Sequence, residues 1–84
     1  MNNSKKDQLR KVLIAGKINV EKYEEIKADI FAECGMSTKN TTDRMKWSNW
    51  INGKVVPGET FQKHINAVLK KHKLNPIYDE VTDN

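Results

Sequence analysis

The chain has 84 residues, of which 37% are hydrophobic and 31% charged, and its formal net charge is +4. This length supports one domain with one small core and excludes two independent cores. The longest apolar stretch, Val12 to Ala15, is far shorter than the roughly 20 residues of a membrane span, and the basic N-terminus has no apolar segment behind it. We therefore expect a cytoplasmic protein that does not enter a membrane.

The first helix is predicted from about Lys5 to Ala15, because its apolar residues recur at helical spacing. Ser4 and Asp7 stand three residues apart, in the manner of a capping box. Gly16 follows where a helix commonly ends.

The second helix is the clearest in the sequence. Asn19 is a suitable N-cap, acidic residues follow in the first turns, and apolar residues repeat every three or four positions as far as Cys34. Gly35 is placed to end this helix in a left-handed conformation.

A polar turn and a third helix come next. Residues Gly35 to Thr42 are rich in side chains that compete with helix for backbone hydrogen bonds, which predicts a turn or loop. The third helix is expected from Asp43 to Asn52, with Thr42 or Asp43 as its cap, and Gly53 ends it.

The last helix is predicted from about Glu59 to His72, after a short connector that contains Pro57. Residues 74–84 carry three acids and no Lys or Arg, so we interpret them as an acidic C-terminal tail that docks through Ile77 and Tyr78. Residues 1–73 then form the folded domain.

Together these elements predict an all-α, compact four-helix domain. Its expected core consists of the apolar residues on the inner helix faces. These are Leu9, Val12, Leu13, Tyr23, Ile26, Ile30, Trp47, Trp50, Ile51, Phe61, Ile65, Val68 and Leu69.

The sequence contains no recognisable catalytic or metal-binding arrangement. His64 and His72 are eight residues apart on one predicted helix, about 12 Å along its axis, which is too far to share a metal ion. Cys34 is the single cysteine and lies on an apolar stripe, where a small buried side chain is expected. We expect no enzyme, no cofactor, no metal and no small-molecule substrate.

The positive charge is concentrated rather than spread evenly. Residues 44–73 contain seven Lys or Arg and one acid, whereas residues 23–43 contain two Lys and five acids. A focused basic stretch of this kind is typical of a protein that binds a polyanion, although it is also compatible with a merely solvated surface.

Residues 34–69 have the order of a helix-turn-helix, and the run from Trp50 to Pro57, with Asn52, Gly53 and Lys54 inside it, strengthens the pattern. Over about residues 20–73 the sequence resembles the lambda-repressor-like (Xre/Cro) DNA-binding family. The turn from Gly35 to Thr42 is longer than the usual turn of about three or four residues. Such a turn either changes the orientation of the third helix or itself contacts the DNA backbone.

The resemblance implies a small transcription regulator that binds double-stranded DNA sequence-specifically and places the helix around residues 43–52 in the major groove. It makes Arg44 and Lys46 candidates for guanine, Asn49 for adenine and Ser48 for either base. It also implies phosphate contacts, for which the candidates are Lys39, Thr41, Thr42 and Lys54. A homodimer is compatible with this family, because helix-turn-helix proteins commonly bind paired half-sites.

Two alternatives from other classes remain open. The same fold could serve as a protein-protein interaction module that does not bind DNA. A binder of RNA or single-stranded DNA would expose Trp47 or Trp50 for stacking on bases, whereas their spacing beside Ile51 favours core packing.

Overall fold

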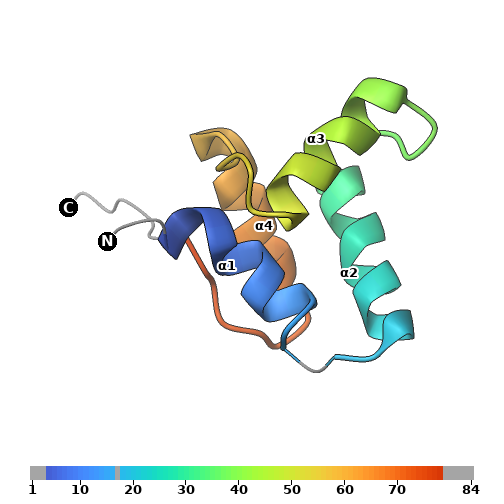
Figure 1. Ribbon diagram of the computed structural model, residues 1–84. Coiled ribbons are helices and arrows are strands. Elements are labelled where there is room, and N and C mark those ends of the chain that lie inside the picture. Colours follow the sequence, from blue (N-terminus) through green and yellow to red (C-terminus); the bar gives the residue numbers. More distant parts are fainter. Residues whose placement is uncertain (1–3, 17, 79–84) are drawn as a thin grey trace.

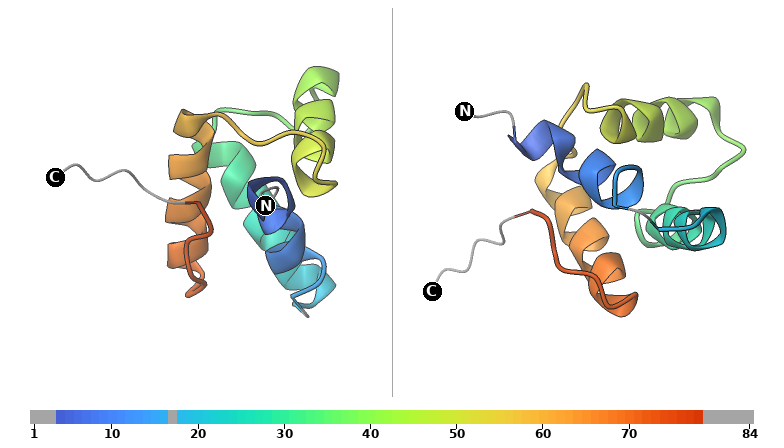
Figure 2. Two further views of the ribbon diagram at one scale, coloured as in Figure 1. Left: turned by 60° about the vertical axis from the view of Figure 1, so that its left-hand side comes forward. Right: turned by 60° about the horizontal axis from the view of Figure 1, so that its bottom comes forward.

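The computed structural model describes residues 4–16 and 18–78, and within these ranges it contains helices and no strand. The helices are α1 (Ser4–Leu13), α2 (Val20–Glu33), α3 (Thr41–Ile51) and α4 (Glu59–Lys71) (Figure 1). α1 packs against α3 and α2 packs against α4, so the domain consists of two helix pairs (Figure 2). The predicted all-α four-helix class is confirmed.

α2 begins and ends as predicted. The side chain of Asn19 accepts a hydrogen bond from the backbone N–H of Lys22 at 2.7 Å, which satisfies one of the free donors of the first turn. At the other end Cys34 is the C-cap, and Gly35 follows with φ +70°, a conformation that favours glycine.

The limits of two other helices differ from the prediction. α1 ends at Leu13 rather than Ala15, because the amides of Ile14 and Ala15 both bond to the carbonyl of Arg10 and close a turn. α4 ends at Lys71, with His72 as its C-cap. Ser4 is the first helical residue of α1, and its side chain lies outside the described part of the chain.

The limits of α3 also differ from the prediction, because the helix begins at Thr41 and not at Asp43. The reason is the N-cap: the side chain of Asn40 accepts the Asp43 N–H at 3.0 Å, a role that we predicted for Thr42 or Asp43. The helix ends at Ile51 with Asn52 as its C-cap.

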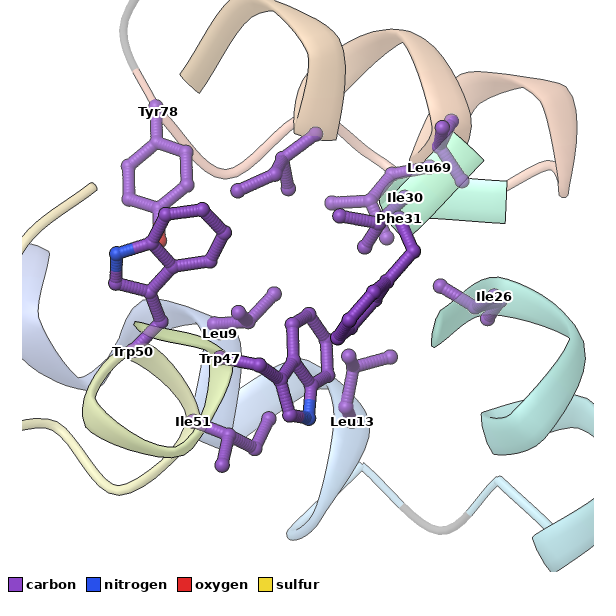
Figure 3. Packing of buried hydrophobic residues seen from close by; sticks show 12 residues of the cluster. Leu9, Leu13, Ile26, Ile30, Phe31, Trp47, Trp50, Ile51, Leu69 and Tyr78 are labelled. Carbon is purple, nitrogen blue, oxygen red and sulfur yellow. The ribbon is translucent and has the colours of Figure 1, made fainter. Parts of the chain in front are cut away.

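One hydrophobic cluster fills the space between the four helices (Figure 3). Three residues of the predicted core, Val12, Tyr23 and Phe61, are only partly buried and pack against its edge. Phe31, which the prediction omitted, is 2% exposed. The buried apolar side chains are Leu9, Leu13, Ile26, Ile30, Phe31, Trp47, Trp50, Ile51, Ile65, Val68, Leu69 and Tyr78.

Aromatic rings join α3 to both helices of the other pair. The Trp47 ring lies 5.7 Å from that of Phe31 in α2, measured between centroids, and its indole N–H donates to the Tyr23 hydroxyl at 3.3 Å. The Trp50 ring lies 5.1 Å from that of Phe61 in α4. Tilted pairs at these separations stabilise a core beyond the area they bury. The inner side of α3 is therefore fixed on two helices at once.

α2 and α4 are linked by charged and polar side chains. His72 lies between Asp29 and Lys22: its Nε2 is 2.7 Å from Asp29 Oδ2, and its Nδ1 is 3.0 Å from the Lys22 ammonium. Because an ammonium group only donates, Nδ1 accepts, and Nε2 carries the hydrogen that bonds to the carboxylate. A weaker pair joins His64 Nδ1 to Glu33 at 3.8 Å.

The segment that follows α4 docks through Ile77 and Tyr78, as predicted. Asn66, a polar side chain only 1% exposed, holds it in place. Its Nδ2 donates to the Tyr78 carbonyl at 2.7 Å, while its Oδ1 accepts the N–H groups of Ile77 and Tyr78 at 3.0 and 3.1 Å. Tyr78 thereby joins the core. Residues 79–84 of the predicted acidic tail lie outside the described residues.

Gly53 allows the start of α1 to approach the end of α3. Its φ is +75°, and a Cβ at this position would come within 2.8 Å of the Asp7 carboxylate and 3.3 Å of the Lys6 carbonyl. The backbone conformation favours glycine here, and a side chain would also require the Asp7 carboxylate and the Lys6 backbone to shift.

Candidate nucleic-acid interface

The turn between α2 and α3 is ordered by its own side chains. The Ser37 N–H donates to the Asp43 carboxylate at 3.0 Å, and the Ser37 hydroxyl accepts the Lys39 N–H at 3.1 Å. From the helix, Arg44 donates to the Thr38 carbonyl at 3.2 Å. These hydrogen bonds satisfy backbone N–H and C=O groups of the turn that have no partner within a helix.

α3 has one buried face and one exposed face. Trp47, Trp50 and Ile51 are buried, so the opposite side of the helix faces solvent. Thr41, Met45 and Ser48 recur there at spacings of four and three residues, and all three are exposed.

The exposed face of α3 carries no carboxylate. Asp43 is the only acidic residue of the helix, and it is partly buried while it accepts the Ser37 amide. Met45 lies near the middle of the face, with 61% of its surface exposed, and is the most apolar residue there. A face with hydroxyl, amide and thioether groups but no negative charge is suited to lie close to a polyanion.

Arg44 and Lys46 lie on opposite flanks of this face, since two residues correspond to about 200° around a helix axis. Arg44 bends back over the turn, with a second, longer contact to the Thr41 hydroxyl at 3.5 Å. The Lys46 ammonium lies 5.0 Å from the centroid of the Phe61 ring, a cation–π contact with α4. The two cations thus point to different sides of α3.

The connector after α3 folds back onto the end of the helix. The Asn49 carbonyl accepts the N–H groups of Lys54 and Val55, at 2.8 and 3.2 Å. Asn49 is partly buried, and Lys54 is exposed just beyond the C-terminal end of α3. Lys39 is exposed in the turn at the N-terminal end. A lysine therefore stands at each end of the face.

All the residues predicted to contact DNA lie in α3 or in the segments that adjoin it. Lys46 and Asn49 are partly buried, and the others are exposed. The exposed ones are Lys39, Thr41, Thr42, Arg44, Ser48 and Lys54. The prediction did not include Met45, although the spacing of the three buried residues of α3 places it on the outer side.

The two tryptophans are not available for stacking on bases. Trp47 is 4% exposed and Trp50 is 3% exposed, and both belong to the hydrophobic core. A single-strand binder that relies on these two rings is inconsistent with this arrangement.

Neither metal nor thiolate chemistry is evident in the described part of the chain. No group of three or more His, Cys, Asp or Glu residues lies close enough to hold a metal ion within residues 4–16 and 18–78. Burial raises the pKa of the Cys34 thiol to about 11, and the neighbouring Glu33 carboxylate adds to this, while Lys46 opposes it. Cys34 therefore stays protonated near neutral pH, where a thiol is a poor nucleophile.

None of the helices in the described ranges combines the length and the apolar character needed to cross a membrane. No protein-family model matches the sequence, and no curated protein and no solved structure matches it either.

Proposed function

We propose that this protein binds double-stranded DNA sequence-specifically, as a small transcription regulator of the helix-turn-helix type, with α3 in the major groove. The observation that carries the proposal is the exposed face of α3, which lacks carboxylates and has a lysine at each end. A helix of this width fits the major groove of B-DNA, where side chains reach the base edges.

Residues at the centre of α3 and residues on its flanks would have different roles in binding DNA. Ser48 and Asn49 would contact base edges, and Met45 would contact an apolar base surface such as the methyl group of thymine. Arg44 and Lys46, which diverge from the helix, would contact phosphates on the two sides of the groove. Their initial assignment to guanine remains the competing prediction for these two side chains.

The remaining contacts would fix the position of the helix on the duplex. Lys39, Thr41 and Thr42 lie at the N-terminal end of α3, where free backbone N–H groups and the helix dipole also favour a phosphate. Lys54 would contact the backbone at the other end. These contacts supply affinity and its dependence on salt but no sequence preference.

The test is a selection of bound duplexes from a random double-stranded pool at about 150 mM salt. We expect an enriched motif for the wild-type protein. Asn49→Ala should lose information at one or two positions of that motif, because each good base contact contributes about 1 to 3 kcal/mol of discrimination.

Arg44→Ala distinguishes between the two roles of that residue. A phosphate contact predicts an unchanged motif, a uniform loss of affinity and a salt dependence weaker by about one released ion. A base contact predicts a relaxed preference at one position. Lys71→Ala is the matched control, since it removes the same charge at the far end of α4, where the Lys71 ammonium is 3.9 Å from Asp29.

An absence of enrichment would contradict the proposal. If binding were weak, salt-sensitive and equal for the wild-type protein and for Arg44→Ala and Asn49→Ala, α3 would not read sequence. The protein-protein interaction module would then be the better interpretation of this fold.

A further inference from the structure

A second exposed surface lies at the corner between α1 and α2. Five apolar residues surround an open hollow of about 240 Å³ there, namely Leu13, Ile14, Ile18, Val20 and Tyr23. We call this surface the α1–α2 patch. Val20 is 75% exposed and Ile14 is 53% exposed, which is unusual for large aliphatic side chains that adjoin one another around a hollow.

The two edges of the patch carry opposite charges. Arg10 lies one helical turn before Ile14, and the hydrogen bond from the Ile14 N–H to the Arg10 carbonyl, 2.8 Å long, shows that helical geometry reaches this far. Glu24 lies one turn after Val20 on α2. Lys11 is also exposed one turn before Ile14, and Glu21 is exposed directly after Val20, so the α1 edge is basic and the α2 edge is acidic.

Neither of these charges is used within the described part of the chain. Arg10 and Glu24 form no ion pair there, and both are exposed. A surface with a cation at one edge and an anion at the other does not suit a polyanion, because the acidic edge would be repelled. It does complement a copy of itself that is rotated by 180°.

We propose that the α1–α2 patch is the interface of a two-fold symmetric homodimer. In such an interface each contact occurs twice. Ile14 would pack against Val20 of the partner subunit, and Arg10 would pair with Glu24 of the partner subunit. The apolar contacts supply the affinity, while the two ion pairs at the rim fix the register.

This position leaves the DNA-binding face free. Figure 1 shows the connection between α1 and α2 at the opposite end of the molecule from the first turn of α3. None of the five residues of the patch is among those assigned to DNA. The dimer thus stands independently of the proposed function, and either proposal can fail alone.

The test is sedimentation equilibrium of the full chain without nucleic acid, over about 1 µM to 1 mM protein. We expect a reversible monomer–dimer equilibrium with a dissociation constant in the micromolar range, as befits a small patch. Ile14→Glu and Val20→Glu should each weaken it at least about tenfold, because each would bury a carboxylate among apolar groups. An acidic residue in the first turn of α2 is compatible with helix formation, so Val20→Glu should still fold.

Val55→Glu is the matched control, since Val55 is an aliphatic residue of the α3–α4 connector with 46% exposure. It should leave the dissociation constant unchanged. A protein that is monomeric at every concentration would overturn the proposal. So would a dimer that tolerates Ile14→Glu, or one that Val55→Glu weakens equally.

A charge exchange tests the register of the dimer. Arg10→Glu and Glu24→Arg should each weaken association several-fold, because each places like charges opposite one another at two symmetric positions. The double variant restores opposite charges and should recover most of the wild-type affinity. A double variant no better than the single ones would overturn the two-fold pairing of α1 with α2.

Discussion

The two helix pairs of this molecule are held together by different kinds of contact. Between α1 and α3 the contact is apolar, and no ion pair or side-chain hydrogen bond crosses it among the described residues. Between α2 and α4, His72 bonds to both Asp29 and Lys22 of α2. Asn66 of α4 makes polar contacts as well, with the docked segment rather than with α2. The contact between α1 and α3 is therefore stabilised by the volume and shape of apolar side chains. The contact between α2 and α4 is also stabilised by charge and by hydrogen bonds.

The largest expected effect tests the apolar side of this comparison. Trp47→Ala removes the indole that packs against Phe31 and bonds to Tyr23, and it leaves a cavity in the core. We expect a loss of about 3 to 5 kcal/mol in the free energy of unfolding, measured by urea denaturation. Trp47→Phe keeps a ring and should cost clearly less. A loss below about 1 kcal/mol for the alanine variant would mean that α3 is fixed by other contacts.

Asn66→Ala tests the polar contacts that α4 makes with the docked segment. The substitution leaves the N–H and C=O groups of Tyr78 without the partners that the amide supplies, in a buried place. We expect a loss of about 2 to 3 kcal/mol. Asn66→Asp has the same shape but cannot donate to the Tyr78 carbonyl, so it should also destabilise the fold. If Asn66→Asp were neutral, packing and not hydrogen bonding would secure the segment.

The docked segment also predicts how stability depends on pH. Burial raises the pKa of Tyr78 from its ordinary value of 10.0 to about 12. Between these values the unfolded chain releases the proton and the folded protein retains it. The contribution of Tyr78 to the free energy of unfolding is therefore fully present below pH 10. It falls by about 2 kcal/mol as the pH rises towards 12.

Tyr78→Phe isolates that contribution, because phenylalanine has no proton to release. The difference in unfolding free energy between Tyr78→Phe and the wild-type protein should change by about 2 kcal/mol in favour of the variant between pH 9 and pH 12. Cys34 loses its proton near pH 11 in both proteins and cancels in this difference. A pH-independent difference would show that the Tyr78 hydroxyl is accessible to water.

The smallest effect compares the two histidines. His72 has a side chain 11% exposed and bonds to two charged groups, so His72→Ala should cost about 1 to 2 kcal/mol. His64 has a side chain 39% exposed and lies 3.8 Å from Glu33. His64→Ala should therefore cost about 0.5 kcal/mol or less. Equal losses would contradict a special role for the His72 contacts.

Much of this architecture could be predicted from the sequence, because its helices carry local signals. Asn19 and Gly35 mark the ends of α2, and the spacing of Trp47, Trp50 and Ile51 identifies the inner face of α3. The cap of α3 was harder to place. Asn40, Thr41, Thr42 and Asp43 are all suitable N-caps, and only the fold of the turn selects Asn40.

The buried role of Asn66 could not be predicted for a different reason. Asparagine is mostly exposed, and its partners here are backbone groups of Ile77 and Tyr78, which lie eleven and twelve residues further along the chain. Met45 could have been found from the helical spacing alone, but an isolated methionine has no charge or hydrogen-bonding signature to single it out. The assignment of α3 to DNA remains a prediction.

The tryptophan pair has an optical consequence. Trp47 and Trp50 have ring centroids 6.4 Å apart at an interplanar angle of 68°, in a buried and apolar setting. Their emission should therefore be blue-shifted in the folded protein, and their coupled transitions should give a distinct near-ultraviolet circular dichroism signal. Because both indoles lie on the inner side of α3, an added duplex that contacts only the outer side would leave both signals unchanged. A spectral change on binding would report that α3 had moved against its neighbours.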